Sequence, residues 1–147
     1  MNVNETLSVL VDAYGERSDG NAPTAAQWAR VLERDPELPF VLVNFFKFNA
    51  KADYGSSDEP ALSGREAFQR YADVSVPSMH KAGGEFLAVA PFAGSFIGQD
   101  QDWDLIAIGK YPNLKAFVAL YGNQDYIRAF RHRTAAVERQ AVIVMEQ

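Results

Sequence analysis

The sequence predicts an α+β fold, and three observations lead to this class. A β-branched and aromatic run at 39–48 is apolar at both alternating positions, as in a strand buried on both faces. Further strand-like runs at 85–90, 103–111 and 141–145 are separated by segments that carry helix-capping or turn signals. The order is therefore βαββαβ, and right-handed crossovers give a four-stranded antiparallel sheet with both helices on one face. This is a ferredoxin-like fold.

Two helices are expected before the first strand. One spans 5–14, and the other begins at Thr24, where a Thr-x-x-Gln pattern forms a capping box, and stops at Pro36. We therefore expect one compact domain in which residues 1–37 are an N-terminal helical extension and residues 38–147 form the ferredoxin-like unit.

Turn and capping residues delimit the elements after the first strand. A Gly-, Ser- and Asp-rich stretch at 51–64 predicts a long loop, and Ser63 with Glu66 forms a second capping box. The expected elements are a helix from Ser63 to Ala82, a strand over 85–90 that can extend to Phe96, a strand over 103–111, a helix from Asn113 to Tyr121, a helix over 125–139 and a strand over 141–145.

Composition and charge exclude several classes of function. A net charge of −5 argues against nucleic acid or an anionic membrane surface as partner. The absence of cysteine excludes disulfides, thiolate nucleophiles and cysteine-ligated metals, and His80 and His132 have no second ligand at helical spacing. We expect neither a metal nor a cofactor. No stretch approaches the roughly 20 apolar residues that span a bilayer, and no signal peptide is evident, so the cytoplasm is the expected location.

The central strand predicts a partner surface. Val41, Val43 and Phe45 alternate with apolar residues of the opposite parity, so both faces of the sheet are apolar. The two core helices cover only one face, and the other would be a large exposed apolar patch in a monomer. We expect a homodimer with the sheets face to face, with one alternative: the N-terminal helices fold over that face instead.

Several segments resemble one uncharacterised family. They are VLVNFFKF, SGREAFQRY, GGEFL, the IG before a WD that opens a strand, YPNLKAFVALY and the HR pair at 132 and 133. Their order and spacing resemble the family known as domain of unknown function 1330, and PTAAQWARVLERDPELPF is similar to an N-terminal extension of some members. Where members often have Asp-Pro, this chain has Asn123-Gln124.

The resemblance implies a dimeric α/β barrel. That superfamily includes cofactor-free monooxygenases, muconolactone isomerases, haem-binding members and proteins without known activity. It therefore implies no particular reaction for this chain.

Four polar residues are candidates for lining a pocket between the helices and the sheet: Asn44, Tyr71, Ser75 and Arg133. Each also has an ordinary structural interpretation. Asn44 can be a satisfied buried amide, Tyr71 a core ring, and Ser75 a hydroxyl that bonds the preceding helical turn. Arg133 borders the buried face of its helix and can equally extend to the surface.

A pocket at these residues would have apolar walls from Leu42, Phe68 and Phe130, while His132 falls on the opposite face of its helix. Its arginine favours a small anionic aromatic or enol-like compound, because the planar fork pairs with a carboxylate. Three functions remain open: an enzyme acting on such a compound without cofactor, a non-catalytic binding or accessory protein, and a structural dimer whose cavity is filled by aromatic rings.

Overall fold

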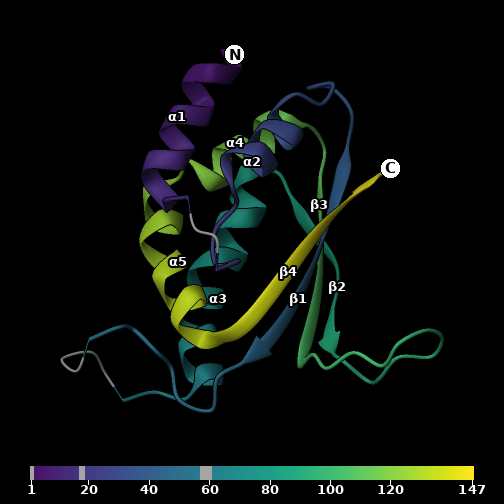
Figure 1. The fold of residues 1–147 in the computed structure, drawn as a ribbon. Coiled ribbons are helices and arrows are strands. Elements are labelled where there is room, and N and C mark those ends of the chain that lie inside the picture. The colour runs from purple at the N-terminus through teal and green to yellow at the C-terminus, as the bar shows by residue number, and fades with distance from the viewer. Residues whose placement is uncertain (1, 17–18, 57–60) are drawn as a thin grey trace.

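The chain forms one four-stranded antiparallel sheet with helices packed on one of its faces, as a computed structural model that describes residues 2–16, 19–56 and 61–147 shows (Figure 1). The strand order is β2-β3-β1-β4. The elements are α1 Val3–Tyr14, α2 Ala25–Leu32, β1 Phe40–Phe48, α3 Gly64–Ala82, β2 Glu85–Pro91, β3 Leu105–Tyr111, α4 Leu114–Tyr121, α5 Gln124–Ala136 and β4 Val137–Glu146. The predicted α+β class and antiparallel sheet are confirmed.

Side-chain caps begin the helices where the sequence predicts them. Thr24 and Ser63 each form a reciprocal capping box, with Gln27 and Glu66 respectively. Asn113 begins α4 by accepting a hydrogen bond from the Ala116 amide at 2.9 Å. Asn123 caps α5 in the same way. These side chains satisfy backbone amides that a helix leaves unpaired, so they fix where each helix starts.

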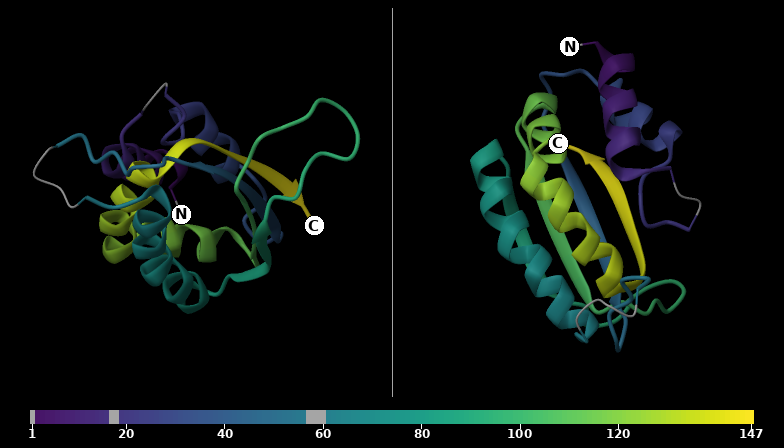
Figure 2. Two further views of the ribbon diagram at one scale, coloured as in Figure 1. Left: turned by 90° about the horizontal axis from the view of Figure 1, so that it is seen from below. Right: turned by 90° about the vertical axis from the view of Figure 1, so that its left-hand side faces the viewer.

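The two N-terminal helices pack on the helical layer, not on the open face of the sheet. Leu10, Trp28 and Leu32 belong to one buried cluster with Phe117 and Tyr121 of α4. Figure 2 shows α1 and α2 beside α5 and β4. The alternative in which these helices cover the helix-free face is therefore wrong.

Several element boundaries differ from the expected ones. The helix expected over 125–139 ends at Ala136, and β4 begins at Val137, four residues before the expected strand. The cause is long-range pairing, because Val137 pairs with Phe48 and Arg139 with Lys47 across the sheet.

Three further elements also differ in one boundary. Helix α2 ends at Leu32, ahead of Pro36, and β3 begins at Leu105. Strand β2 ends at Pro91 without reaching Phe96. Of the expected loop at 51–64, residues 57–60 lie outside the described residues.

The face of the sheet opposite the helices is apolar. Its apolar side chains come from alternate positions of three strands and are Val41, Val43, Phe45, Ile106, Ile108, Ala141, Ile143 and Met145, and the charged Lys47, Lys110 and Arg139 lie on the same face toward the strand ends. Val41 and Val43 are buried, whereas Ile143 on the edge strand is 51% exposed. The connection between β2 and β3 projects away from the helices (Figure 2), and it carries Phe96 and Ile97, the two most exposed large apolar residues of the described chain.

Three segments meet at Gly64, the first residue of α3. The Gly64 amide donates to the Asn49 carbonyl at 3.1 Å, and the Asn49 amide donates to the Ala136 carbonyl at 2.8 Å. A Cβ atom on Gly64 would lie 2.1 Å from the Asn49 oxygen and 2.6 Å from the Ala136 oxygen. Because both atoms belong to the backbone, only glycine allows the start of α3 to approach the ends of β1 and α5 this closely.

We predict that Gly64→Ala destabilises the protein by about 1–3 kcal/mol, because the added methyl group forces these backbones apart. At an ordinary position in a helix the same change would stabilise by up to about 1 kcal/mol. Urea unfolding measures the difference. A higher unfolding midpoint for Gly64→Ala would contradict the close approach.

Candidate functional site

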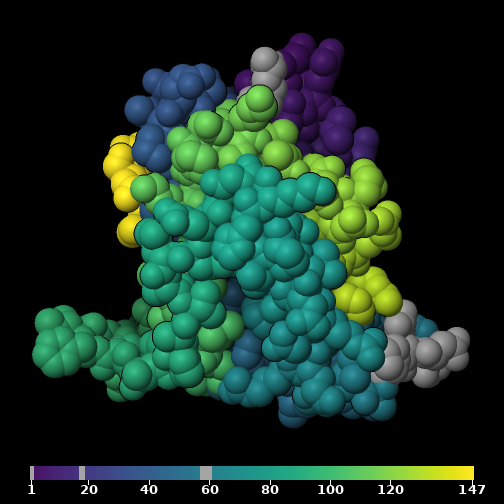
Figure 3. All heavy atoms as spheres, turned by 180° about the vertical axis from the view of Figure 1, so that it is seen from behind, coloured from purple at the N-terminus to yellow at the C-terminus, as the bar shows by residue number. Residues whose placement is uncertain are grey.

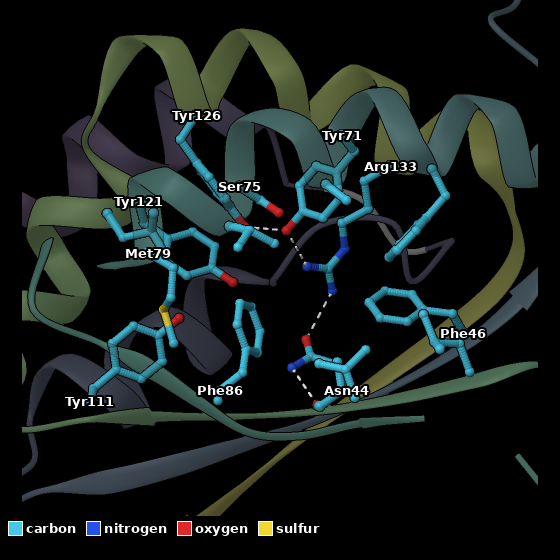
Figure 4. A pocket seen from close by; sticks show the side chains of 18 residues that line it. Asn44, Phe46, Tyr71, Ser75, Met79, Phe86, Tyr111, Tyr121, Tyr126 and Arg133 are labelled. Atoms are coloured by element: carbon cyan, nitrogen blue, oxygen red, sulfur yellow. Dashed lines mark hydrogen bonds between the residues drawn. The ribbon is translucent and has the colours of Figure 1, made fainter. Parts of the chain in front are cut away.

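An interior cavity of about 90 Å³ lies between α3 and the sheet. All four residues predicted to line a pocket, Asn44, Tyr71, Ser75 and Arg133, line it (Figure 4). Its other walls are largely aromatic and include Phe46, Phe68, Phe86, Tyr111, Tyr121 and Tyr126, together with Met79. Seen from behind, the surface is hollowed between α3 and β2 (Figure 3), and the exposed Val76 and Val89 lie at this opening.

Three elements place the polar residues around the cavity. Asn44 lies in the middle of β1 and shares the helix-facing parity of Phe46. Tyr71 and Ser75 lie four residues apart on α3, so they occupy one face of that helix. Arg133 lies in the last turn of α5. The helix–sheet interface thus brings together side chains that are distant in sequence.

Arg133 is the centre of the polar network in the cavity. Its Nε donates to Gln140 Oε1 at 2.8 Å, Nη1 donates to the Tyr71 hydroxyl at 3.1 Å, and Nη2 donates to Asn44 Oδ1 at 3.3 Å. The sequence placed Arg133 at the border of the buried face of its helix. In the structure it is only 4% exposed, so it is more deeply buried than expected. All three partners are neutral.

Three aromatic rings flank the guanidinium. The Arg133 Cζ atom lies 4.7 Å from the ring centre of Phe46, 5.1 Å from that of Phe130 and 5.6 Å from that of Tyr71. The negative faces of such rings attract a cation. They stabilise the charge of Arg133 without neutralising it.

The expected apolar walls are only partly present. Phe68 lines the cavity, but Leu42 and Phe130 do not. Leu42 belongs to the buried core cluster, and Phe130 lies against Arg133 and packs its ring edge-on to Tyr14. The wall is completed instead by rings from β2, β3 and α4, which a helical-wheel argument on α3 and α5 cannot place.

The cavity keeps an uncompensated positive charge. Among the described residues, no carboxylate lies within 4.0 Å of Arg133 in an ion pair. Burial opposes its charged form, but the phenol oxygens of Tyr71, Tyr121 and Tyr126 favour it, so the pKa of Arg133 lies above its ordinary value. Burial also raises the pKa of Tyr121 and Tyr126, so these phenols are neutral at pH 7.

The sequence left two interpretations of Asn44 open, a satisfied buried amide and a residue that lines a pocket. The structure shows contacts of both kinds. Its Nδ2 donates to the Ala107 carbonyl at 3.0 Å and, at 3.5 Å, to that of Leu42. Its Oδ1 accepts from Arg133, and the side chain lines the cavity. Because a guanidinium has only donors, this contact fixes which end of the amide faces the cavity.

Tyr71 joins α3 to α5 through two residues. Its hydroxyl lies 2.7 Å from that of Tyr126, in addition to accepting from Arg133. Sequence reasoning missed Tyr126 and Gln140. Tyr126 lies four and seven residues before Phe130 and Arg133, a helical stripe that could have revealed it. Gln140 was missed because its strand was expected to begin one residue later.

Neither histidine contributes to the cavity. His132 is half-buried and its Nδ1 lies 2.6 Å from the Tyr54 hydroxyl, whereas His80 is exposed on α3. Within the described ranges, no three His, Cys, Asp or Glu side chains are grouped to hold a metal ion. No helix in the described part of the chain is long and apolar enough to cross a membrane.

A second, larger hollow of about 670 Å³ lies on another side of α5. Its lining includes the acidic Asp53 and Glu138 and the basic Arg131, together with amides such as Asn21 and Asn49. Because both signs of charge line this hollow, its electrostatics do not favour an anion as those of the first cavity do.

The fold and cavity define the class: an α+β protein with a buried arginine in a small, mostly aromatic cavity. The family described as Domain of unknown function (DUF1330) matches residues 61–147, more than half of the chain, and this protein belongs to that family. The matched segment contains Tyr71, Ser75 and Arg133, whereas Asn44 precedes it.

Two crystal structures share the fold. One is of methylated RPA0582 protein, with 30% identity and a TM-score of 0.80 over 89% of this chain and 96% of that chain. The other is of the RPA0582 protein from Rhodopseudomonas palustris, described as a protein of unknown function, with 30% identity and a TM-score of 0.78 over 88% of this chain and 98% of that one. No curated protein matches the sequence.

The buried phenols predict a loss of stability at alkaline pH. Burial is the main cause that raises the pKa of Tyr14, Tyr111, Tyr121 and Tyr126 above the ordinary 10.0. Above pH 10 the unfolded chain therefore releases protons that the folded chain retains, so the free energy of unfolding falls as pH rises. Melting temperatures between pH 8 and 11, with absorbance at 295 nm as the probe of phenolate, measure this. Ionisation of more than two of the six tyrosines well before unfolding would contradict it.

Proposed function

We propose that the interior cavity binds a small organic anion and that Arg133 holds its negative group. The observation that carries this proposal is a buried guanidinium whose bonded partners among the described residues are all neutral. An isolated buried charge costs several kcal/mol unless it is paired, so a site that keeps one favours an occupant of opposite charge.

The donors of Arg133 suit a planar anion. Its contacts with Gln140, Tyr71 and Asn44 use one N–H on each of its three nitrogens, and the second N–H on each Nη atom remains for a ligand or for the neighbouring Tyr121 hydroxyl. Two parallel N–H groups match the two oxygens of a carboxylate. The oxygen of an enolate would be stabilised in the same place, which is the form that catalysis without a cofactor would take.

The size of the cavity limits the rest of the ligand. A cavity of about 150 Å³ is known to hold benzene, and this one is about 90 Å³. A carboxylate with a few carbon atoms therefore fits within it. An aromatic acid would place its ring toward the opening between Val76 and Val89, where the walls remain apolar.

The small volume also favours a second candidate, a structural role without ligand. Bulky rings such as Phe46, Phe68 and Phe86 already occupy most of the space between α3 and the sheet. In that case Arg133 serves only to join α5 to α3, β1 and β4.

We also propose that the chain forms a homodimer through the helix-free face of the sheet, as in a dimeric α/β barrel. The middle of this face is apolar, and the described part of the chain folds no helix over it. The connection between β2 and β3 projects away from the helices (Figure 2), and its exposed Phe96 and Ile97 would contact a second copy.

We predict that Gln140→Glu lowers the affinity for organic anions at least about tenfold, because a carboxylate at the position of Oε1 would neutralise Arg133. Stability is roughly retained, since the new ion pair with Arg133 offsets the loss of the hydrogen bond from Gln140 to Asn21. Calorimetric titration with acetate, pyruvate and benzoate, with benzamide as the neutral analogue, measures the affinity.

Gln27→Glu is the matched control, because it adds the same charge in a capping box where Glu is equally suited. It should bind as the wild type does. Undiminished anion binding by Gln140→Glu would refute the role of Arg133. If the wild type binds none of the three anions, the structural role stands.

For the dimer, we predict that Ile143→Asp yields a folded monomer, since it places a charge on the exposed edge of the helix-free face. Val9→Asp is the control, at a 63% exposed apolar position on α1 away from that face. Light scattering should give about twice 16.3 kDa for the wild type and for Val9→Asp. A wild-type mass near 16.3 kDa at micromolar concentration would overturn the proposal.

A further inference from the structure

We propose that Asn21, in the connection between α1 and α2, is a positioning residue for Arg133 and acts through Gln140. The N-terminal helices would thereby set the anion affinity of the interior cavity. This inference rests on the proposed function, and it assigns a role to a segment that precedes the part of the chain matched by the family.

Hydrogen bonds form a continuous path from the cavity to the connection. Gln140 Oε1 accepts from Arg133 Nε at 2.8 Å, and Gln140 Nε2 donates to Asn21 Oδ1 at 3.3 Å. Gln140 lies on the helix-facing side of β4, opposite Phe46. The amide of Gln140 therefore spans the distance between the buried guanidinium and the N-terminal segment.

The polarity of this path is fixed. A guanidinium can only donate, so the oxygen of Gln140 must face Arg133 and its NH2 group must face away. That NH2 group needs an acceptor, and Asn21 Oδ1 supplies it. Because β4 is an edge strand, it has no further strand on this side to offer a carbonyl.

The connection that carries Asn21 is itself anchored. The Asn21 amide donates to Asp19 Oδ1 at 3.0 Å, and the next residue, Ala22, is buried. The hydroxyl of Tyr14, at the end of α1, donates to the Tyr121 carbonyl at 2.6 Å, and Trp28 of α2 is 2% exposed. Asn21 is therefore held in place from both sides.

Loss of this acceptor would free a flexible side chain. Gln140 has three rotatable bonds and is only half-buried, so its orientation depends on having a partner at each end of the amide. If Gln140 turns away, Arg133 loses the bond that fixes its Nε, and its two Nη groups no longer keep one direction in the cavity.

The test compares Asn21→Leu, which removes the acceptor, with Asn21→Asp, which retains it. Asn2→Ala is the matched control, since it removes the cap of α1 and weakens the N-terminal helices without touching Gln140. One readout is the solvent exchange rate of the Arg133 Nε–H in nitrogen-15 NMR spectra, assigned by its loss in Arg133→Lys. The other is the affinity for pyruvate and benzoate.

We expect Asn21→Leu to accelerate Nε–H exchange and to weaken anion binding, each by about threefold to tenfold. Asn21→Asp should keep the wild-type exchange rate, because it retains the acceptor, and Asn2→Ala should keep the wild-type values of both readouts. Asn21→Ala replaces Asn21→Leu if the larger side chain prevents folding.

Wild-type exchange in both Asn21→Leu and Asn21→Ala would overturn the inference, and so would equal acceleration in Asn2→Ala. If exchange responds as expected but the wild type binds neither anion, the proposed function fails and the positioning role stands. If the anions bind and neither readout changes in Asn21→Leu, the function stands and the positioning role fails.

Discussion

The burial of the Arg133 guanidinium is the constraint on which the rest of this structure depends. From α5 it bonds to β1 through Asn44, to α3 through Tyr71 and to β4 through Gln140, so it joins both layers of the fold. A cation taken out of water needs oriented dipoles around it, and each neighbouring amide presents its oxygen. The contacts that hold α5 on the sheet are thus the same contacts that shape the cavity.

Two features of the cavity, its unfilled space and the buried charge of Arg133, each lower the stability of the fold. The unfilled space of about 90 Å³ gives up packing contacts, and an unpaired buried charge costs several kcal/mol. A core built for stability alone would fill the space with a larger apolar side chain and replace the arginine. The polar groups are also oriented before anything binds, so little reorganisation opposes an incoming anion.

Local patterns in the sequence predict the architecture and the four polar residues of the cavity. Capping boxes at Thr24 and Ser63 and strand parity around Asn44 are local signals, and the structure confirms these caps and places Asn44 on the helix-facing side. The end of α5 could not be predicted in this way, because pairing with β1 decides that Val137 is extended. Because the start of β4 was placed too late, Gln140 was not predicted as a strand residue facing the cavity. The burial of Arg133 depends on rings from other elements.

The junction between α5 and β4 contains no connecting residue, since Ala136 ends the helix and Val137 begins the strand. Arg133 and Gln140 lie on either side of it, so their spacing is set by covalent geometry rather than by a flexible turn. A single-residue insertion there would shift β4 by one position and turn Gln140 to the opposite face of the sheet. Relatives that keep this arginine contact are therefore expected to vary in loop lengths elsewhere, but not at this junction.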